Sequence, residues 1–309
     1  MARRLRIFPQ HSAVTLRPRL ACEITLAGVV AARQENDLDA AAITSFAPLL
    51  PGSVKPSLNA ANFPHPERVV AALKQALDQV VERDRKLTLV IPDGAVRVLL
   101  LDFDSLPDKA SEVLPILRFR LRKLLPFEVD DAAVSYQVMT KTGDQVRVML
   151  AVTPHHVLAE YEKVVRDAGY EPGAVLPSTL CALAAIPDDT DALVINQNSA
   201  CITTAITRQN EVLLLRTLEL PEHAGNDLPD IQQAVSVAIA YFEDSLNVPL
   251  ESLFYVGPGG ASAFDVLLNQ QESGVPVVRV RDLVAPPETG AVSPVPIGIL
   301  AGVTGALAN

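Results

Sequence analysis

The sequence predicts an α/β fold made of two similar halves, the first of which carries an insert. A pattern of three strands, a helix and a fourth strand occurs between residues 20 and 91 and returns between residues 192 and 256. Between the two copies, residues 96–176 follow a different order, namely strand, helix, strand, strand, helix, strand. The 309 residues, of which 49% are hydrophobic, are enough for two ordinary cores and a small additional unit.

Composition and charge limit the classes of function. The net charge of −10 argues against general nucleic-acid binding, and the mean hydropathy of +0.24 indicates a globular chain. No apolar run is long enough to suggest a membrane span. The three cysteines, Cys22, Cys181 and Cys201, lack metal-type spacing, and their odd number fits a reducing compartment better than a disulfide framework.

Residues 1–19 form a predicted basic arm with five arginines, Arg3, Arg4, Arg6, Arg17 and Arg19. No apolar core follows the first arginines, so we do not expect a secretory signal. Two interpretations stay open for the arm, a solvated tail or a contact with anionic lipid or an acidic partner.

The first half is predicted from residues 20–95 together with residues 177–187. We expect strands over 20–26, 29–33, 41–46 and 87–91, and a helix over 66–83. Pro66 suits the first position of this helix, where a missing amide costs little, and its valines and leucines form one apolar face. Pro92-Asp93-Gly94 ends the last strand.

The insert is predicted from residues 96–176. We expect strands over 96–103, 133–139, 145–153 and 173–176, and helices over 112–125 and 153–167. Pro115 is expected near the first turn of the first helix, and Thr153 and Pro154 at the N-cap and first position of the second. His155 and His156 point in different directions on a helix, which favours surface residues over metal ligands.

The second half is predicted from residues 188–309. A short helix over 177–185 leads to a boundary at Pro187-Asp188-Asp189. We expect strands over 192–196, 200–207, 211–218, 253–256 and 275–280, and helices over 229–246, 261–269 and 296–307.

Several short segments resemble one family. In chain order they are Leu89-Val90-Ile91-Pro92-Asp93, Arg118-Phe119-Arg120 with Leu125-Pro126-Phe127, Tyr136, Ala151-Val152, Ala168-Gly169-Tyr170-Glu171-Pro172, Arg216, and Tyr255-Val256-Gly257-Pro258-Gly259-Gly260. Their order and spacing, from about residue 20 onward, resemble PilM, the cytoplasmic protein of type IV pilus assembly, and the cytoplasmic domain of the type II secretion protein GspL.

The resemblance implies an actin-like fold, with duplicated RNase H-like βββαβ units and a βαββαβ insert in the first half. In that family a nucleotide lies between the halves, next to one strand-turn-strand element from each half. The resemblance places eight residues at this cleft, namely Glu23, Thr25, Asn196, Asn198, Ser199, Gly257, Gly259 and Gly260.

Two turns depart from the family pattern. Thr25 stands in place of a glycine, and its Cβ would crowd an approaching phosphate. Asn196 replaces an aspartate and cannot supply the charge that Mg²⁺ prefers, whereas Asn198 is able to keep its turn through a left-handed conformation. Pro258 removes one backbone donor from the glycine-rich loop. We therefore expect a degenerate nucleotide site with no resident cofactor, and binding of ATP and Mg²⁺ is the alternative.

The resemblance predicts a non-catalytic scaffold, cytoplasmic and peripheral to the inner membrane, for a pilus or secretion assembly platform. It would dock the N-terminal tail of an inner-membrane partner in a groove that involves the first helix of the insert. Four cations on that helix, Arg118, Arg120, Arg122 and Lys123, then meet acidic partner groups or lipid headgroups, or they form an ordinary solvated face.

The sequence leaves two enzymatic alternatives. The first is an actin-like ATPase that binds ATP and Mg²⁺ in the cleft and self-associates. The second is a sugar or acetate kinase, which would need a catalytic acid and intact phosphate turns. The sequence shows no patterned catalytic triad, no zinc-type spacing and no Walker lysine motif, so we expect no catalytic residues and no metal site.

Overall fold

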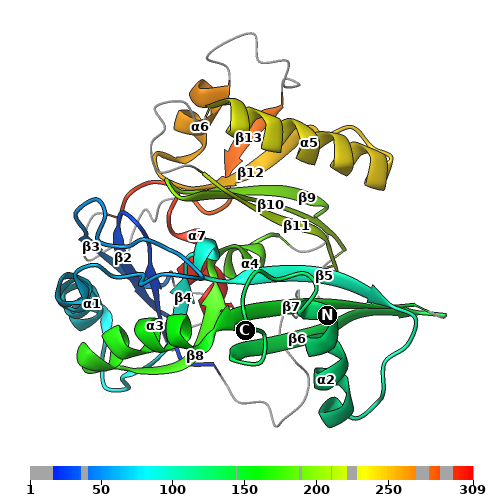
Figure 1. Ribbon diagram of the computed structural model, residues 1–309. Helices are drawn as coiled ribbons and strands as arrows, with labels where there is room; N and C mark the ends of the chain where they lie inside the picture. Colours follow the sequence, from blue (N-terminus) through cyan, green and yellow to red (C-terminus); the bar gives the residue numbers. More distant parts are fainter. Residues whose placement is uncertain are drawn as a thin grey trace.

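The computed structural model describes residues 17–35, 41–143, 145–187, 190–209, 211–220, 228–268, 278–285 and 295–308. Two five-stranded sheets and one three-stranded sheet organise these residues (Figure 1). The large sheets have the same strand order, β3-β2-β1-β4-β8 in the first half and β11-β10-β9-β12-β13 in the second. In each, the central strand pairs antiparallel with the second strand and parallel with the fourth, so the predicted duplication is confirmed.

The first sheet is covered on one face by two amphipathic helices. Its elements are β1 (Leu20–Ile24), β2 (Gly28–Arg33), β3 (Ile43–Pro48), α1 (Pro66–Val80), β4 (Lys86–Ile91), α3 (His155–Asp167) and β8 (Glu171–Pro177). Leu73 and Leu77 of α1 and Tyr161 of α3 are fully buried against the aliphatic side chains of the strands. The apolar face predicted for each helix is thus the face that packs.

The second half repeats this layout with α5 along its sheet. Its elements are β9 (Ala192–Gln197), β10 (Cys201–Arg208), β11 (Glu211–Glu219), α5 (Leu228–Leu246), β12 (Ser252–Val256), α6 (Gly260–Leu268) and β13 (Arg279–Asp282). Val235, Ile239 and Phe242 of α5 pack on the strands. Part of the predicted helix 261–269 and of the predicted strand 275–280 lies outside the described residues.

The order of elements predicted for residues 96–176 is present, but hydrogen bonding divides it between two sheets. β5 (Arg97–Phe103), β6 (Ala132–Thr142) and β7 (Gln145–Pro154) form the small sheet in the order β5-β7-β6, and α2 (Ala110–Leu121) packs on it. β8 instead pairs in parallel with β4, and α3 lies beside α1. Residues 155–177 therefore complete the first sheet, and the repeated unit is longer than predicted, because β8 and β13 correspond.

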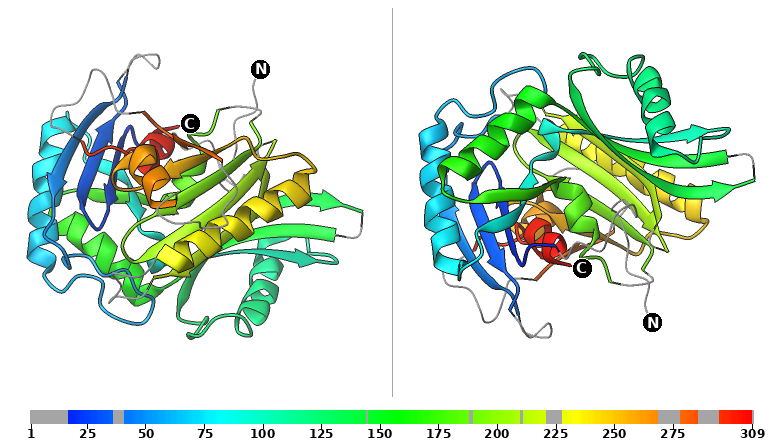
Figure 2. Two further views of the ribbon diagram at one scale, coloured as in Figure 1. Left: turned by 90° about the horizontal axis from the view of Figure 1, so that it is seen from above. Right: turned by 90° about the horizontal axis from the view of Figure 1, so that it is seen from below.

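Two short helices exchange between the halves. Leu180 and Leu183 of α4 (Ser178–Leu183), which ends the first half, pack with strands of the second sheet. α7 (Ala301–Leu307), the last described helix, lies against β1, β2 and β4 of the first sheet (Figure 2). Its Val303 is buried in the apolar cluster on that face. The two helices touch so closely that a Cβ at Gly305 would overlap the carbonyl oxygen of Cys181.

Three predicted helix starts are corrected. Thr153 and Pro154 end β7, and α3 begins at His155, because the Thr153 hydroxyl donates to the carbonyl oxygen of Ala95 (2.8 Å) rather than to a helix amide. Pro115 lies inside α2, beyond its first turn. The closing helix begins at 301 rather than 296, because Gly298 just before it has a left-handed backbone (φ 87°). Among the described residues, no helix is long and apolar enough to cross a membrane.

Candidate functional site: a cleft between the two halves

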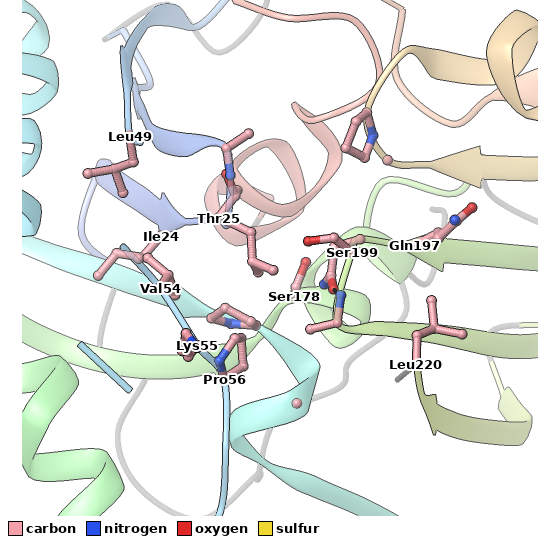
Figure 3. A pocket seen from close by; sticks show the side chains of 18 of the residues that line it. Ile24, Thr25, Leu49, Val54, Lys55, Pro56, Ser178, Gln197, Ser199 and Leu220 are labelled. Atoms are coloured by element: carbon pink, nitrogen blue, oxygen red, sulfur yellow. Dashed lines mark hydrogen bonds between the residues drawn. The ribbon is translucent and has the colours of Figure 1, made fainter. Parts of the chain in front are cut away.

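A cavity of about 1060 Å³ lies between the halves and is lined by segments of both (Figure 3). The first half contributes the β1–β2 turn, the β3–α1 loop and the residues after β4, and the second half contributes the β9–β10 turn and the loop after β12. Six of the eight predicted residues line it: Glu23, Thr25, Asn196, Asn198, Ser199 and Gly257. Gly259 and Gly260 follow in the same loop without lining the cavity.

The two hairpin turns at the cleft are closed in the same way by one side chain each. Thr25 Oγ1 accepts hydrogen bonds from the amides of Ala27 (3.2 Å) and Gly28 (3.1 Å). Asn198 Oδ1 accepts from the amides at the equivalent offsets, Ala200 (2.8 Å) and Cys201 (2.9 Å). In each turn, two backbone N–H groups therefore already donate to a side chain of the protein. Free backbone N–H groups in such turns are the kind that bind phosphate.

Asn198 keeps its turn, but not through the left-handed backbone that asparagine is able to adopt. Gln209 and Asn247 are the non-glycine residues with positive φ in the described part of the chain. The Asn198 side chain makes the turn instead, which is the usual behaviour of asparagine in an Asx turn.

The glycine-rich loop after β12 is also satisfied by its own surroundings. The Gly257 amide donates to the carbonyl oxygen of Gly298 (2.8 Å), and the Ala261 amide at the start of α6 donates to Asp282 Oδ1 (2.8 Å). Gly260 has φ 69°, and a Cβ there would lie 2.8 Å from the same carboxylate oxygen. This loop needs its glycines for close packing, and its helix start is capped by a carboxylate.

A buried polar network joins the halves at the base of the cleft. The Ser178 hydroxyl of α4 donates to Glu23 Oε1 (2.6 Å), and the Asn196 side-chain nitrogen Nδ2 of β9 donates to Ser178 Oγ (3.1 Å). Glu23 is only 6% exposed. The pKa of Glu23 is raised to about 7, mainly by burial; the hydrogen bond from Ser178 opposes this shift, and the nearby charge of Asp93 adds to it.

Asp93 is the second buried carboxyl group of this network. It accepts hydrogen bonds from the Thr179 hydroxyl, from the Thr179 amide (3.0 Å) and from the Asn196 amide nitrogen (3.4 Å). Burial raises the pKa of Asp93, while its hydrogen bonds from Thr179 and Thr203 oppose the shift. Asp93, Ser178 and Thr179 were not predicted as site residues. Their position directly after the parallel strands β4 and β8 was the available signal, since such residues meet at one sheet edge.

The charges that line the cleft do not favour a polyanion. Lys55 is the cationic side chain of the lining, against the two carboxylates of Glu23 and Glu219. Glu219 is paired with Arg97. In the described ranges, no group of three or more His, Cys, Asp or Glu side chains is arranged to hold a metal ion.

Asn62 holds the β3–α1 loop, which forms one wall of the cleft. Its side chain accepts from the Ser57 amide (3.0 Å) and the Tyr161 hydroxyl (3.1 Å) and donates to the carbonyl oxygens of Ser57 (2.9 Å) and Ala60 (3.0 Å). The Asn62 amide donates to the Glu160 carboxylate (2.7 Å). The fully buried asparagine thus fixes the loop to α3.

The four cations predicted to bind a partner lie at the C-terminal end of α2 and just beyond it. Two are used within the chain, since Arg118 donates to the carbonyl oxygens of Val129 and Ala132, and Arg122 pairs with Asp130 (2.7 Å). Arg120 and Lys123 are exposed, and Lys123 lies 5.1 Å from the centre of the Phe119 ring. The partner role of these residues stays a prediction.

A smaller cavity of about 270 Å³ lies between the insert and the first half. Its lining comes from β6, β7, α3 and β8 and includes Val134, Leu158, Ala174 and Val175. The first helix of the insert, α2, contributes no lining residue to this cavity. β6 and β8 are the outer strands of their sheets in the described part of the chain, so each presents a backbone edge beside this groove.

Comparison of the sequence with protein-family profiles gives no match, and comparison with curated proteins gives none. Comparison with solved structures gives clear matches. A chain of the PilM–PilN type IV pilus biogenesis complex aligns with a TM-score of 0.72 at 17% identity, over 94% of this chain and 98% of that one. The protein has the actin-like fold.

Two further structures with related architecture were found. The chain also aligns with the cytoplasmic domain of EpsL, an inner-membrane component of the type II secretion system of Vibrio cholerae. That alignment has a TM-score of 0.50 at 13% identity, over 94% of both chains. A Bacteroides thetaiotaomicron protein with an actin-like ATPase fold and unknown function aligns with a TM-score of 0.49 at 10% identity, over 87% of this chain and 94% of that one.

Proposed function

We propose that the protein is a scaffold of a type IV pilus or type II secretion assembly platform, where it docks the N-terminal tail of an inner-membrane partner from the cytoplasmic side. The observation that carries this proposal is the structural match, over nearly the full length of both chains, with a chain of the PilM–PilN complex. The match with EpsL, whose cytoplasmic domain belongs to an inner-membrane component, supports the same setting.

The groove between β6 and β8 is the docking site in this proposal. Its floor is apolar, with Val134, Leu158 and Val175 only partly buried, and an outer strand flanks it on either side. An extended peptide pairs with such an edge through its backbone and places alternate side chains in the groove. The partner tail is therefore an extended segment with apolar side chains at every second position.

The test is peptide binding to two variants of one helix. Leu158 lines the groove, whereas its neighbour Ala159 is exposed and does not. With a synthetic peptide of a PilN N-terminal tail as probe, Leu158→Glu should weaken binding about 10- to 100-fold, because an apolar contact is lost and a charge is introduced. Ala159→Glu, the matched control, should bind as the natural chain does. Equal binding by all three proteins would reject this groove.

The cleft between the halves serves as a degenerate nucleotide site in the same proposal. Thr25 and Asn198 occupy the turn amides, and the base of the cleft holds two buried carboxyl groups rather than phosphate-binding cations. Binding of ATP and Mg²⁺ remains the alternative function, because the cavity of about 1060 Å³ is in the size range of small-molecule sites. Calorimetric titration separates the two.

A further inference from the structure

A basic pocket lies at the end of the first sheet opposite the cleft. The parallel strands β1 and β4 both run from this pocket to the cleft. Arg19 and Lys86 line the pocket at the starts of these strands, and Thr25 and Pro92 line the cleft just after their ends. The pocket has a volume of about 660 Å³ and is built from the end of the arm, the end of β2, the α1–β4 connection and the start of β8.

Cations outnumber acids in this pocket. Its charged lining residues are Arg17, Arg19, Arg33, Arg83 and Lys86 against Glu82 and Asp84. This excess is notable in a chain whose net charge is −10, because it concentrates positive potential at one place on an otherwise acidic molecule.

The cations of the pocket fall into a fixed set and an exposed set. Arg33 is held in place, since its Nε donates to the carbonyl oxygen of Val80 (2.6 Å) and its Nη1 lies 3.1 Å from Glu82. Arg83 and Lys86 are exposed, and within the described ranges neither forms an ion pair. The fixed arginine shapes the wall, and the two exposed cations are placed to meet an anion from solvent.

We propose that this pocket binds the phosphate-bearing headgroup of an anionic lipid at a membrane surface. The sequence adds to this charge, because three more arginines, Arg3, Arg4 and Arg6, precede Arg17 in the chain. Each Lys or Arg of a basic cluster near the surface strengthens binding to an anionic leaflet about fivefold.

The pocket adjoins the docking groove along β8. Gly173 and Ala174 of β8 line both cavities. A headgroup bound here would hold the start of the groove near the bilayer, where a tail that emerges from a membrane protein begins. The link between headgroup and groove rests on the proposed function, whereas the charge of the pocket does not. A lipid-binding experiment without any partner protein therefore tests the pocket alone.

The experiment is co-sedimentation of the full chain with vesicles of phosphatidylglycerol and phosphatidylcholine, compared with vesicles of phosphatidylcholine alone. We expect binding to the first kind only, and weaker binding as salt is added. Arg83→Glu with Lys86→Glu should lower the vesicle partition coefficient about 30-fold or more, because two surface cations are lost and two anions gained. The matched control, Arg279→Glu with Arg281→Glu, reverses two exposed cations on β13 in the other half and should change binding far less.

Four outcomes would overturn the proposal, provided that melting curves show both double variants to be folded. The first is absence of binding to phosphatidylglycerol vesicles. The second is binding that Arg83→Glu with Lys86→Glu leaves unchanged, and the third is an equal loss in both double variants. The fourth is that inorganic phosphate raises the melting temperature in a way that depends on Arg83 and Lys86, while no vesicle binding is seen. That result would assign the pocket to free phosphate. PilN-peptide binding is a separate measurement, so failure here leaves the scaffold proposal standing.

Discussion

Replacing Glu23 by glutamine should change how the stability of this protein depends on pH. Glu23 is buried at the base of the cleft, and its pKa is raised to about 7 from an ordinary value of 4.5. A raised carboxyl pKa means that the folded state holds its proton more tightly than the unfolded state does. As pH rises through the range between these two values, the unfolded chain loses its proton first, and the free energy of unfolding falls.

The size of the effect follows from the shift. A pKa difference of about 2.5 units at 1.36 kcal/mol per unit corresponds to a destabilisation of roughly 3 kcal/mol by the buried carboxyl group. This destabilisation is present in full above pH 7 and absent below about pH 4.5. Glutamine has the same shape, keeps an oxygen to accept the hydrogen bond from Ser178, and does not titrate. Relative to the natural chain, Glu23→Gln should therefore gain up to about 3 kcal/mol as pH rises from 5 to 8.

The assay is urea denaturation of both proteins at intervals between pH 5 and pH 8.5. Glu171→Gln, an exposed glutamate at the start of β8, is the control and should follow the natural chain. Parallel stability curves for Glu23→Gln and the natural chain would refute the reasoning, because they would mean that the carboxyl group titrates alike in the folded and unfolded states. The raised pKa of Asp93 works in the same direction and remains in both proteins.

Two further predictions concern the walls of the cleft. In calorimetric titration with Mg²⁺, the natural chain should show weak or no ATP binding, and it should show no measurable turnover. Thr25→Gly, Asn196→Asp and Asn198→Gly together should raise the affinity for ATP at least about tenfold, because each freed amide bonds phosphate with about 1.5–3 kcal/mol. Micromolar affinity in the natural chain would contradict this prediction. Asn62→Ala should lower the free energy of unfolding by about 2–4 kcal/mol, because it leaves buried backbone groups of the loop and the Tyr161 hydroxyl without their partner. The measurement is urea denaturation, with Asn59→Ala at an exposed position of the same loop as the control. Equal stability of the two variants would contradict this prediction.

The elements that sequence reasoning predicted well are those with a long and regular apolar face. α1 and α5 were found close to their true bounds because each buries one stripe of aliphatic side chains against a sheet. The partner of β8 was not predicted, because alternation reports which side chains are buried and not which strand supplies the hydrogen bonds. β8 reaches β4 only after the whole small sheet has been inserted between them.

The candidate site shows a similar division. The resemblance to the family drew attention to Thr25 and Asn198, and the structure shows what each does to its turn. Asp93 was given no site role, because its partner Thr179 lies 86 residues away and no local pattern connects them. A buried carboxyl group that bonds across the molecule is visible only once the sheet edges are assembled.

The exchange of α4 and α7 makes the two copies of the repeat interdependent. A fragment that stops near residue 187 would keep α4 but lack α7, the helix that covers β1, β2 and β4. The complementary fragment would keep α7 and lack the leucines of α4 that pack against its own strands. Each fragment would expose an apolar sheet face of the kind that leads to aggregation. Co-expressed, the two could cover each other's faces, which makes the region between the halves the natural position for a split reporter of this protein.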